Sequence, residues 1–341
     1  MDAQVLAVGS YTAATGGRGP GLALVERDPV TGRLGRVGAT VDVPSPSFLA
    51  AGPDGTIHAA HELDEGSVSS WRVGGGAWER LGETPSGGSW PCHLTVLPGF
   101  ALAANYGGGV GVLALDGGAV ADLRQTLRGN GSGPDAERQE GSHPHSTAVL
   151  PGGRVAVLDL GTDEVRVHDV TAEGLSLEPV QVLALAPGTG PRHGALVPGP
   201  DGDRFVVAGE LDATVTSLAV RDGLLADPVR NPALAVPVPA ALAERVYPSE
   251  VCRTPWGLVV ANRRAEVLTL HEVADGVARP VRDIAIGAAN PRHVVAVGRH
   301  LYVAAQDSDQ LVHLALDDDL TVVDRSVVEL GSPSCVLPLP V

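Results

Sequence analysis

The sequence predicts an all-β fold, a seven-bladed β-propeller, from three observations: a motif that occurs seven times, strand-like segments after each copy, and a last copy near the C-terminus. The motif is a proline followed by one or two polar residues and then an apolar run, usually preceded by a small or polar residue. Its copies begin at Ser45, Trp90, His143, Gly190, Tyr247, Asn290 and Ser332. Their spacing of 42 to 57 residues matches a four-stranded propeller blade.

The segments that follow the motif are typical of short strands. After residues 48–51 come the turn Pro53-Asp54-Gly55 and a second apolar run at 57–60, and the same succession follows the third and fourth copies. Short β-branched runs between Pro, Gly and Asp turns indicate strands, and no part of the chain keeps a long helical period. We expect at most one helical turn, at 239–245.

The two ends of the chain are predicted to share one blade. The seventh motif lies so close to the C-terminus that it can supply only one strand, while residues 6–10 already resemble a second strand. We therefore expect residues 336–337 to complete the blade begun by residues 5–43. Such closure removes exposed sheet edges, and residues 1–341 are predicted to form one propeller domain.

Composition narrows the classes of partner. The net charge is −16, and all 24 basic residues are arginines, so an acidic surface without basic runs argues against nucleic acid and membrane partners. The three cysteines have no CxxC spacing and form no disulfide framework. The first residues resemble no signal peptide, and no run of about 20 apolar residues occurs. We expect a cytoplasmic location, and the sequence does not indicate the oligomeric state.

Polar residues of the repeats are predicted to meet at one mouth of the central channel. The motif opens each innermost strand, and a second polar set follows 12 to 17 residues later, where the next strand returns to the same mouth. Binding sites commonly lie in such concave mouths. The candidate residues are His93, His143, His145, Arg192, His193, Glu210, Glu250, Arg263, Arg292 and His293.

The arginines in this set indicate the class of ligand. Each histidine or carboxylate by itself indicates a structural role at a strand corner more than a functional one. Arg192, Arg263 and Arg292 differ, because each keeps its charge and presents a fork that suits carboxylate or phosphate. We expect a small anionic ligand. The spacing of His143 and His145 reveals no third ligand for a metal, and no cofactor motif or GxSxG nucleophile elbow is present.

A series of further motifs runs along nearly the whole chain. In order, they are Gly9–Thr12, Pro91–His93, Ala104–Tyr106, Gly131–Gly133, Arg138–Gly141, His143–Ser146, Asp159–Asp163, Gly190–His193, Glu210–Leu211, Ser249–Glu250, Asn262–Arg263, Asn290–His293 and Gln306–Asp309. This series resembles the propeller lactonase family, which contains bacterial 6-phosphogluconolactonases and fungal carboxy-muconate lactonizing enzymes. Arg264 stands where the family has a glycine.

The resemblance implies a site and a reaction. It implies that His145, Arg192, Glu210 and Arg263 are catalytic, under a long loop at 117–142. It also implies a lactonase of carbohydrate metabolism that opens an anionic sugar-acid lactone, with 6-phosphogluconolactone as the first candidate and no cofactor. His145 then acts as general base on water. The two arginines hold the substrate anion and stabilise the oxyanion, and Glu210 orients an arginine or the water, or serves as acid.

Two other functions remain open on the sequence. A muconate-type lactonizing enzyme needs the same anion clamp and proton-transfer group, and product analysis separates it from a hydrolase. A non-enzymatic propeller that binds a partner through its faces predicts that mutations in the channel leave function intact.

Overall fold

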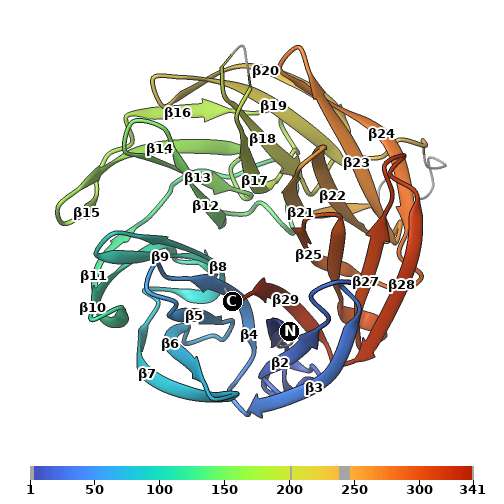
Figure 1. The fold of residues 1–341 in the computed structure, drawn as a ribbon. Coiled ribbons are helices and arrows are strands. Elements are labelled where there is room, and N and C mark those ends of the chain that lie inside the picture. The colour runs from blue at the N-terminus through green and yellow to red at the C-terminus, as the bar shows by residue number, and fades with distance from the viewer. Residues whose placement is uncertain (1–3, 200–201, 238–245, 340–341) are drawn as a thin grey trace.

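The computed structural model describes residues 4–199, 202–237 and 246–339, which form seven blades around a central channel (Figure 1). This arrangement confirms the predicted seven-bladed propeller. Helical structure in the described residues is limited to two 3-10 turns, η1 (Ala13–Thr15) and η2 (Gln306–Ser308). The helical turn predicted at 239–245 lies outside the described residues. No helix in the described part of the chain has the length and apolar character to span a membrane.

Each blade is an antiparallel sheet whose strands follow one another outward from the channel. Four blades, from the inside outward, are β29 (Pro333–Pro338), β1 (Gln4–Ser10), β2 (Leu22–Arg27) and β3 (Leu34–Val41); β4 (Pro46–Ala51), β5 (Ile57–His61), β6 (Ser67–Gly74) and β7 (Ala77–Pro85); β8 (Ser89–Leu97), β9 (Phe100–Gly107), β10 (Gly109–Asp116) and β11 (Ala119–Leu127); and β12 (Pro144–Leu150), β13 (Arg154–Asp159) and β14 (Glu164–Thr171), with both β15 (Gly174–Leu175) and β16 (Gln181–Ala184) on β14. The other three are β17 (Pro191–Val197), β18 (Arg204–Gly209), β19 (Thr214–Arg221) and β20 (Leu224–Pro232); β21 (Tyr247–Thr254), β22 (Gly257–Arg263), β23 (Val267–Ala274) and β24 (Val277–Ala285); and β25 (Pro291–Val297), β26 (His300–Ala305), β27 (Gln310–Leu316) and β28 (Val322–Glu329).

The ring closes where the two ends of the chain pair. Strand β29 lies antiparallel to β1, with Val8 opposite Val336 and Ala7 opposite Leu337. The predicted closure is therefore confirmed. One blade thus contains residues from both ends of the sequence, and this pairing ties the first and last strands of the chain into one sheet.

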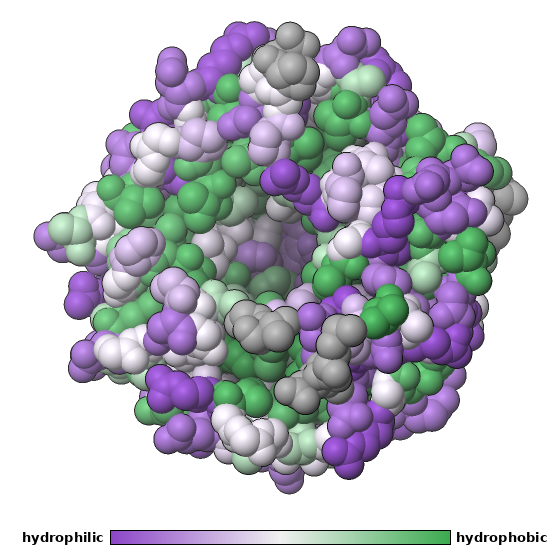
Figure 2. Space-filling model, viewed as in Figure 1, coloured by the Kyte–Doolittle hydropathy of each residue, from purple (hydrophilic) through white to green (hydrophobic). Residues whose placement is uncertain are grey.

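The core lies between neighbouring blades. The second strand of each blade is an almost fully buried apolar run, as in β13, because both of its faces pack against adjacent blades. In one such interface, Leu158 and Val165 of one blade pack with Phe205 and Leu218 of the next. The apolar runs after each proline motif therefore hold the ring together, and the space-filling view shows the hollow at its centre (Figure 2).

Strand register brings the polar ends of the repeats to one mouth. The motif proline pairs with the last residue of the second strand in several blades, as in Pro46 with His61, Pro144 with Asp159 and Pro191 with Gly209. Each innermost strand consequently begins beside the point where the next strand ends. The sequence-predicted meeting of the two polar sets at one mouth is thus a consequence of hairpin pairing.

Candidate functional site

A cavity of about 290 Å³ lies at the mouth where the innermost strands begin. All four residues that the resemblance marks as catalytic line it, together with Arg292. The full lining is Glu62, Trp90, Cys92, Tyr106, Arg138, His145, Arg192, Glu210, Arg263 and Arg292. These side chains come from several blades, so the cavity exists only when the ring is closed.

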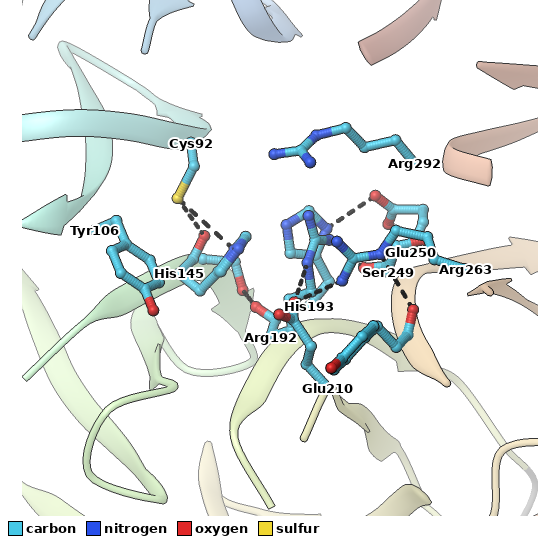
Figure 3. A network of polar contacts seen from close by, with 12 residues as sticks. Cys92, Tyr106, His145, Arg192, His193, Glu210, Ser249, Glu250, Arg263 and Arg292 are labelled. Carbon is cyan, nitrogen blue, oxygen red and sulfur yellow. Dashed lines mark hydrogen bonds and ion pairs between the residues drawn. The ribbon is translucent and has the colours of Figure 1, made fainter. Parts of the chain in front are cut away.

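Glu210 is the electrostatic centre of the cavity (Figure 3). It follows directly after β18, and its side chain is only 4% exposed. Its Oε1 atom is 2.7 Å from Nη2 of Arg138, and its Oε2 atom is 2.8 Å from both Nε of Arg192 and Nη2 of Arg263. One carboxylate is therefore the shared counter-ion of three guanidinium groups.

These ion pairs set the protonation state of Glu210. Burial alone raises the pKa of this carboxyl, but the charges of Arg263, Arg192 and Arg138 outweigh burial and hold the pKa at about 2. The group is ionised near neutral pH and has no proton to donate there. Of the roles considered from the sequence, orientation of an arginine or of water fits this state, and general acid does not.

The cavity carries more positive than negative charge. Four arginines line it, against the two carboxylates Glu62 and Glu210. The guanidinium of Arg192 is further fixed by a hydrogen bond to the Ser249 carbonyl, and Nε of Arg263 donates to the Tyr247 carbonyl over 3.1 Å. Rigid, already desolvated donors of this kind favour an anion, because their orientation is fixed before a ligand arrives.

Two hydrogen-bond donors of the arginine cluster around Glu210 have no acceptor in the part of the chain that the structure describes. Nε of Arg192 and Nη2 of Arg263 are buried and lie near Glu210, yet neither makes a hydrogen bond of good geometry there. Buried donors without acceptors are uncommon in folded proteins. Glu210 therefore balances part of the charge of the cluster without meeting its hydrogen-bonding capacity.

His145, in β12, lines the cavity beside Cys92 of β8. Nδ1 of His145 lies 3.7 Å from Sγ of Cys92, and this thiol is 3.4 Å from the His145 carbonyl. Burial, and then the charges of Arg192 and the neighbouring His193, lower the pKa of His145 well below 6.5. The imidazole is therefore neutral near pH 7 and has a nitrogen free to accept a proton.

The remaining predicted histidines occupy other positions. His93, His193 and His293 surround Phe48, with ring centroids 4.3, 5.9 and 5.7 Å from its ring. Nδ1 of His193 lies 2.8 Å from Oε2 of Glu250, and Nε2 of His293 lies 3.5 Å from the same oxygen. None of these histidines, nor Glu250, lines the cavity, so they form a supporting layer in the channel wall.

His143 also supports the cavity from behind. Its ring stacks on Tyr106 with centroids 4.3 Å apart, and its Nδ1 atom lies 2.7 Å from the Tyr106 carbonyl. Nε2 of His143 lies 2.9 Å from Oε1 of Glu140. His143 therefore positions Tyr106, which faces the cavity.

The loop expected at 117–142 is shorter than predicted. Residues 119–127 form β11, the outer strand of a blade, so the connection runs only from 128 to 143. The sequence there alternates too irregularly to be recognised as a strand, and its edge position leaves all but one of its residues at least partly exposed. Gln139 anchors the loop, because its side-chain amide donates to the Leu160 carbonyl and to Asp163, each over 2.8 Å.

The loop supplies a cavity residue that the site prediction omitted. Arg138 reaches Glu210 and also donates from Nε to the Tyr106 hydroxyl over 3.3 Å. Its side chain is 36% exposed, far more than those of Arg192 and Arg263. The Arg138–Gly141 motif lay in the resemblance, but spacing alone could not bring this residue, which follows β11, to the end of a strand two blades further on.

Arg292 lies on the opposite side of the cavity, where Figure 3 shows its guanidinium facing the open centre. It sits 4.9 Å from the ring of Tyr11 and 3.8 Å from Oε2 of Glu62, and the Tyr11 hydroxyl donates to Glu62 over 2.6 Å.

Arg264, beside Arg263, has φ 71°, the left-handed conformation that favours glycine. Over the described residues, no three His, Cys, Asp or Glu side chains are grouped as metal ligands.

Known proteins share this fold and sequence pattern. The family described as "Lactonase, 7-bladed beta-propeller" matches residues 5–338. A protein of Arthroderma benhamiae named "Probable 6-phosphogluconolactonase" is 27% identical over 96% of this chain and 89% of its own length. The 6-phosphogluconolactonase of Bacillus subtilis is 29% identical over 56% of each chain. The structure of the periplasmic gluconolactonase of Pseudomonas aeruginosa superposes with a TM-score of 0.89 at 25% identity, covering 99% of this chain and 100% of that one.

Proposed function

Because the chain belongs to the seven-bladed β-propeller lactonase family, we propose that it hydrolyses an anionic sugar-acid lactone at the cavity around Glu210. The first substrate to test is 6-phosphogluconolactone, since two of the relatives carry the name of that activity. The observation that carries the proposal is the surplus of fixed arginines around one ionised carboxylate, next to a neutral histidine.

Binding is assigned to the arginines. Four guanidinium groups against two carboxylates attract an anion into the cavity. Arg192 and Arg263 are largely desolvated, so their interaction with it is stronger than in water. Arg192 and Arg263 are held by Glu210 and by main-chain carbonyls, so they keep their orientation as charge develops on the substrate. Glu210 is a positioning residue in this scheme.

The chemistry is assigned to His145. Its neutral imidazole removes a proton from a water molecule while the water oxygen attacks the lactone carbonyl carbon. The carbonyl oxygen becomes an oxyanion, which Arg192 and Arg263 stabilise. When the intermediate collapses, the bond to the ring oxygen breaks and the imidazolium returns its proton to that oxygen, giving the hydroxy acid.

The anion also activates the base. Burial is the main cause of the lowered pKa of His145, and Arg192 and Arg292 lower it further; a bound anion neutralises part of the charge of these arginines. The basicity of His145 therefore increases when the substrate occupies the cavity, which couples proton transfer to binding.

The test is hydrolysis of freshly generated 6-phosphogluconolactone by wild type and Arg192→Ala, followed by proton release against the spontaneous rate. Arg36→Ala is the matched control, because Arg36 is an 80% exposed residue of an outer strand. Turnover that falls at least about 100-fold in Arg192→Ala, with the melting temperature nearly preserved, supports the assignment. Equal kinetics of Arg192→Ala and Arg36→Ala would refute it.

Two finer statements depend on further measurements. Absence of acceleration on the phosphorylated lactone, with turnover of an unphosphorylated one, would replace the substrate but retain the reaction class. The cytoplasmic location stays a prediction, because a structural relative is described as periplasmic, and cell fractionation tests it.

A further inference from the structure

A second cavity adjoins the candidate site at the same mouth of the channel. Its volume is about 460 Å³, larger than that of the first. Both cavities are lined by Glu62, Trp90 and Arg292, so these three side chains form their common wall. The proposed hydrolysis makes no use of this second space.

The two cavities differ in charge. In the second, Arg18 and Arg292 face the carboxylates Glu62 and Asp307 in equal number, whereas the first has two more arginines than carboxylates. Arg18 is further neutralised by Asp309, whose Oδ2 atom lies 2.6 Å from its Nε. The second cavity therefore offers donors and acceptors for hydrogen bonds without a net preference for an anion.

Trp90 presents an apolar surface between the two cavities. It is 45% exposed, and its ring is oriented by a hydrogen bond of 2.8 Å from Nε1 to Oδ1 of Asp64. A fixed, exposed indole beside polar groups is suited to packing against one face of a ring that carries hydroxyl groups on its edge.

The backbone at Trp90 singles out this side chain. The residue before the motif proline has a positive φ in five blades, and at four of these positions it is serine, glycine or asparagine; these residues are Ser45, Gly190, Asn290 and Ser332. Trp90, at φ 53°, places the largest side chain in a conformation that bulky residues rarely adopt. The repeat imposes this backbone conformation in five blades, and only here does it carry a bulky side chain; strained residues of this kind cluster at ligand sites, which agrees with a binding role for the indole.

We infer that the second cavity is a subsite for an uncharged sugar ring attached to the sugar acid in the first. The inference rests on the proposed function and names its substrate class: lactones of glycosylated sugar acids. The sugar-acid unit occupies the arginine-rich cavity, and the attached ring packs on Trp90. Glu62 and Asp307 accept hydrogen bonds from its hydroxyls, and Arg18 donates to them.

The experiment compares the binding of disaccharide acids with that of gluconate. Titration calorimetry with gluconate, cellobionate, maltobionate and lactobionate uses open-chain acids, so it does not require turnover. We expect at least one disaccharide acid to bind wild type about tenfold more tightly than gluconate, as one stacked ring allows. Trp90→Ala should reduce this affinity ratio to near one, and Trp90→Phe should restore most of it.

Two further variants sharpen the comparison. Asp307→Ala, which alters only the second cavity, should lower the ratio about threefold through one lost hydrogen bond. Leu177→Ala, at a 75% exposed position outside both cavities, is the control that should leave every affinity as in wild type. Melting curves establish that each variant is folded.

The outcomes separate the subsite from the lactonase proposal. If none of the three disaccharide acids binds wild type more tightly than gluconate, or if Trp90→Ala weakens all ligands equally, the subsite is refuted. If the affinity ratio behaves as expected but no lactone is hydrolysed, the subsite stands and the lactonase proposal fails.

Discussion

Replacement of Glu210 by glutamine removes one negative charge from the centre of the arginine cluster and keeps the size of the side chain. Arg138, Arg192 and Arg263 all lie within 2.8 Å of its carboxylate oxygens. A neutral amide leaves these three guanidinium groups without their shared counter-ion. We expect Glu210→Gln to destabilise the folded state, because uncompensated charge in a desolvated cluster is unfavourable.

The magnitude follows from the protonation of Glu210. Its pKa is about 2 in the folded protein, against an ordinary value of 4.5, a difference that corresponds to about 3 kcal/mol of stabilisation. A chain of 341 residues unfolds with an entropy of about 0.7 kcal/mol/K. The melting temperature of Glu210→Gln should therefore fall by about 4 °C at pH 7.

The stabilisation that the charge of Glu210 provides depends on pH. Because the folded-state pKa is lower than the unfolded one, the stabilisation is complete above pH 4.5 and is lost as the pH falls towards 2. The difference between wild type and variant should consequently shrink below pH 4.5. Added inorganic phosphate should raise the melting temperature of the variant more than that of wild type, since an anion replaces the missing charge.

Differential scanning calorimetry measures the melting temperature, its dependence on pH and its response to phosphate. The matched control is Glu26→Gln, whose partner Arg36 is highly exposed, so its ion pair contributes at most about 1 kcal/mol. Equal melting temperatures of Glu210→Gln and Glu26→Gln at pH 7 would refute the role assigned to Glu210. A phosphate response no larger than that of wild type would contradict the proposed charge surplus.

Four further outcomes are expected. His145→Gln should lower kcat at least about 100-fold in steady-state assays, and the acid limb of the wild-type kcat/KM profile should lie below pH 6.5, because the pKa of His145 is lowered in the folded protein. Arg138→Ala should raise KM about tenfold through the loss of one charged contact, with kcat less affected; an unchanged KM removes the residue from binding. Burial also lowers the pKa of His93 and His193, so thermal stability should be complete above pH 6.5 and decline as the pH falls towards 5, which melting curves across this range will test. Removal of residues 333–341 deletes β29 and, with it, the buried apolar side chains of Cys335 and Val336. The loss of these two side chains alone should lower the free energy of unfolding by about 4 kcal/mol. Urea titration measures this loss, and a transition midpoint equal to that of wild type would contradict it.

Residues near the repeat motif were the predictable part of the site. Arg192 and Arg292 each follow a motif proline at the start of an innermost strand. Arg263 ends β22, the second strand of its blade, which pairs with the innermost strand β21. Because hairpin pairing returns every second strand to the mouth where the first begins, the order of residues along the chain was sufficient to bring these side chains together.

Residues outside the repeat could not be placed in the same way. Arg138 lies on a connection of irregular conformation, and its contact with Glu210 spans 72 residues. The boundary between β11 and this connection was also missed, because an exposed edge strand has no apolar alternation by which to recognise it. Trp90, likewise, was recognised only as a motif residue, since its exposure and left-handed backbone are properties of the folded ring.

The sequence by itself determined the number of blades, the closure through β1 and β29, and the end of the channel at which charge collects. Local hairpin register carries this information, and a repeated motif records it seven times. Only the tertiary structure decided which charged groups meet. It assigned three arginines to one carboxylate, moved His93, His193, His293 and Glu250 into a supporting layer, and divided the mouth into two cavities of different charge. Those distinctions depend on side-chain direction and burial between blades, which involve contacts between residues far apart in the chain.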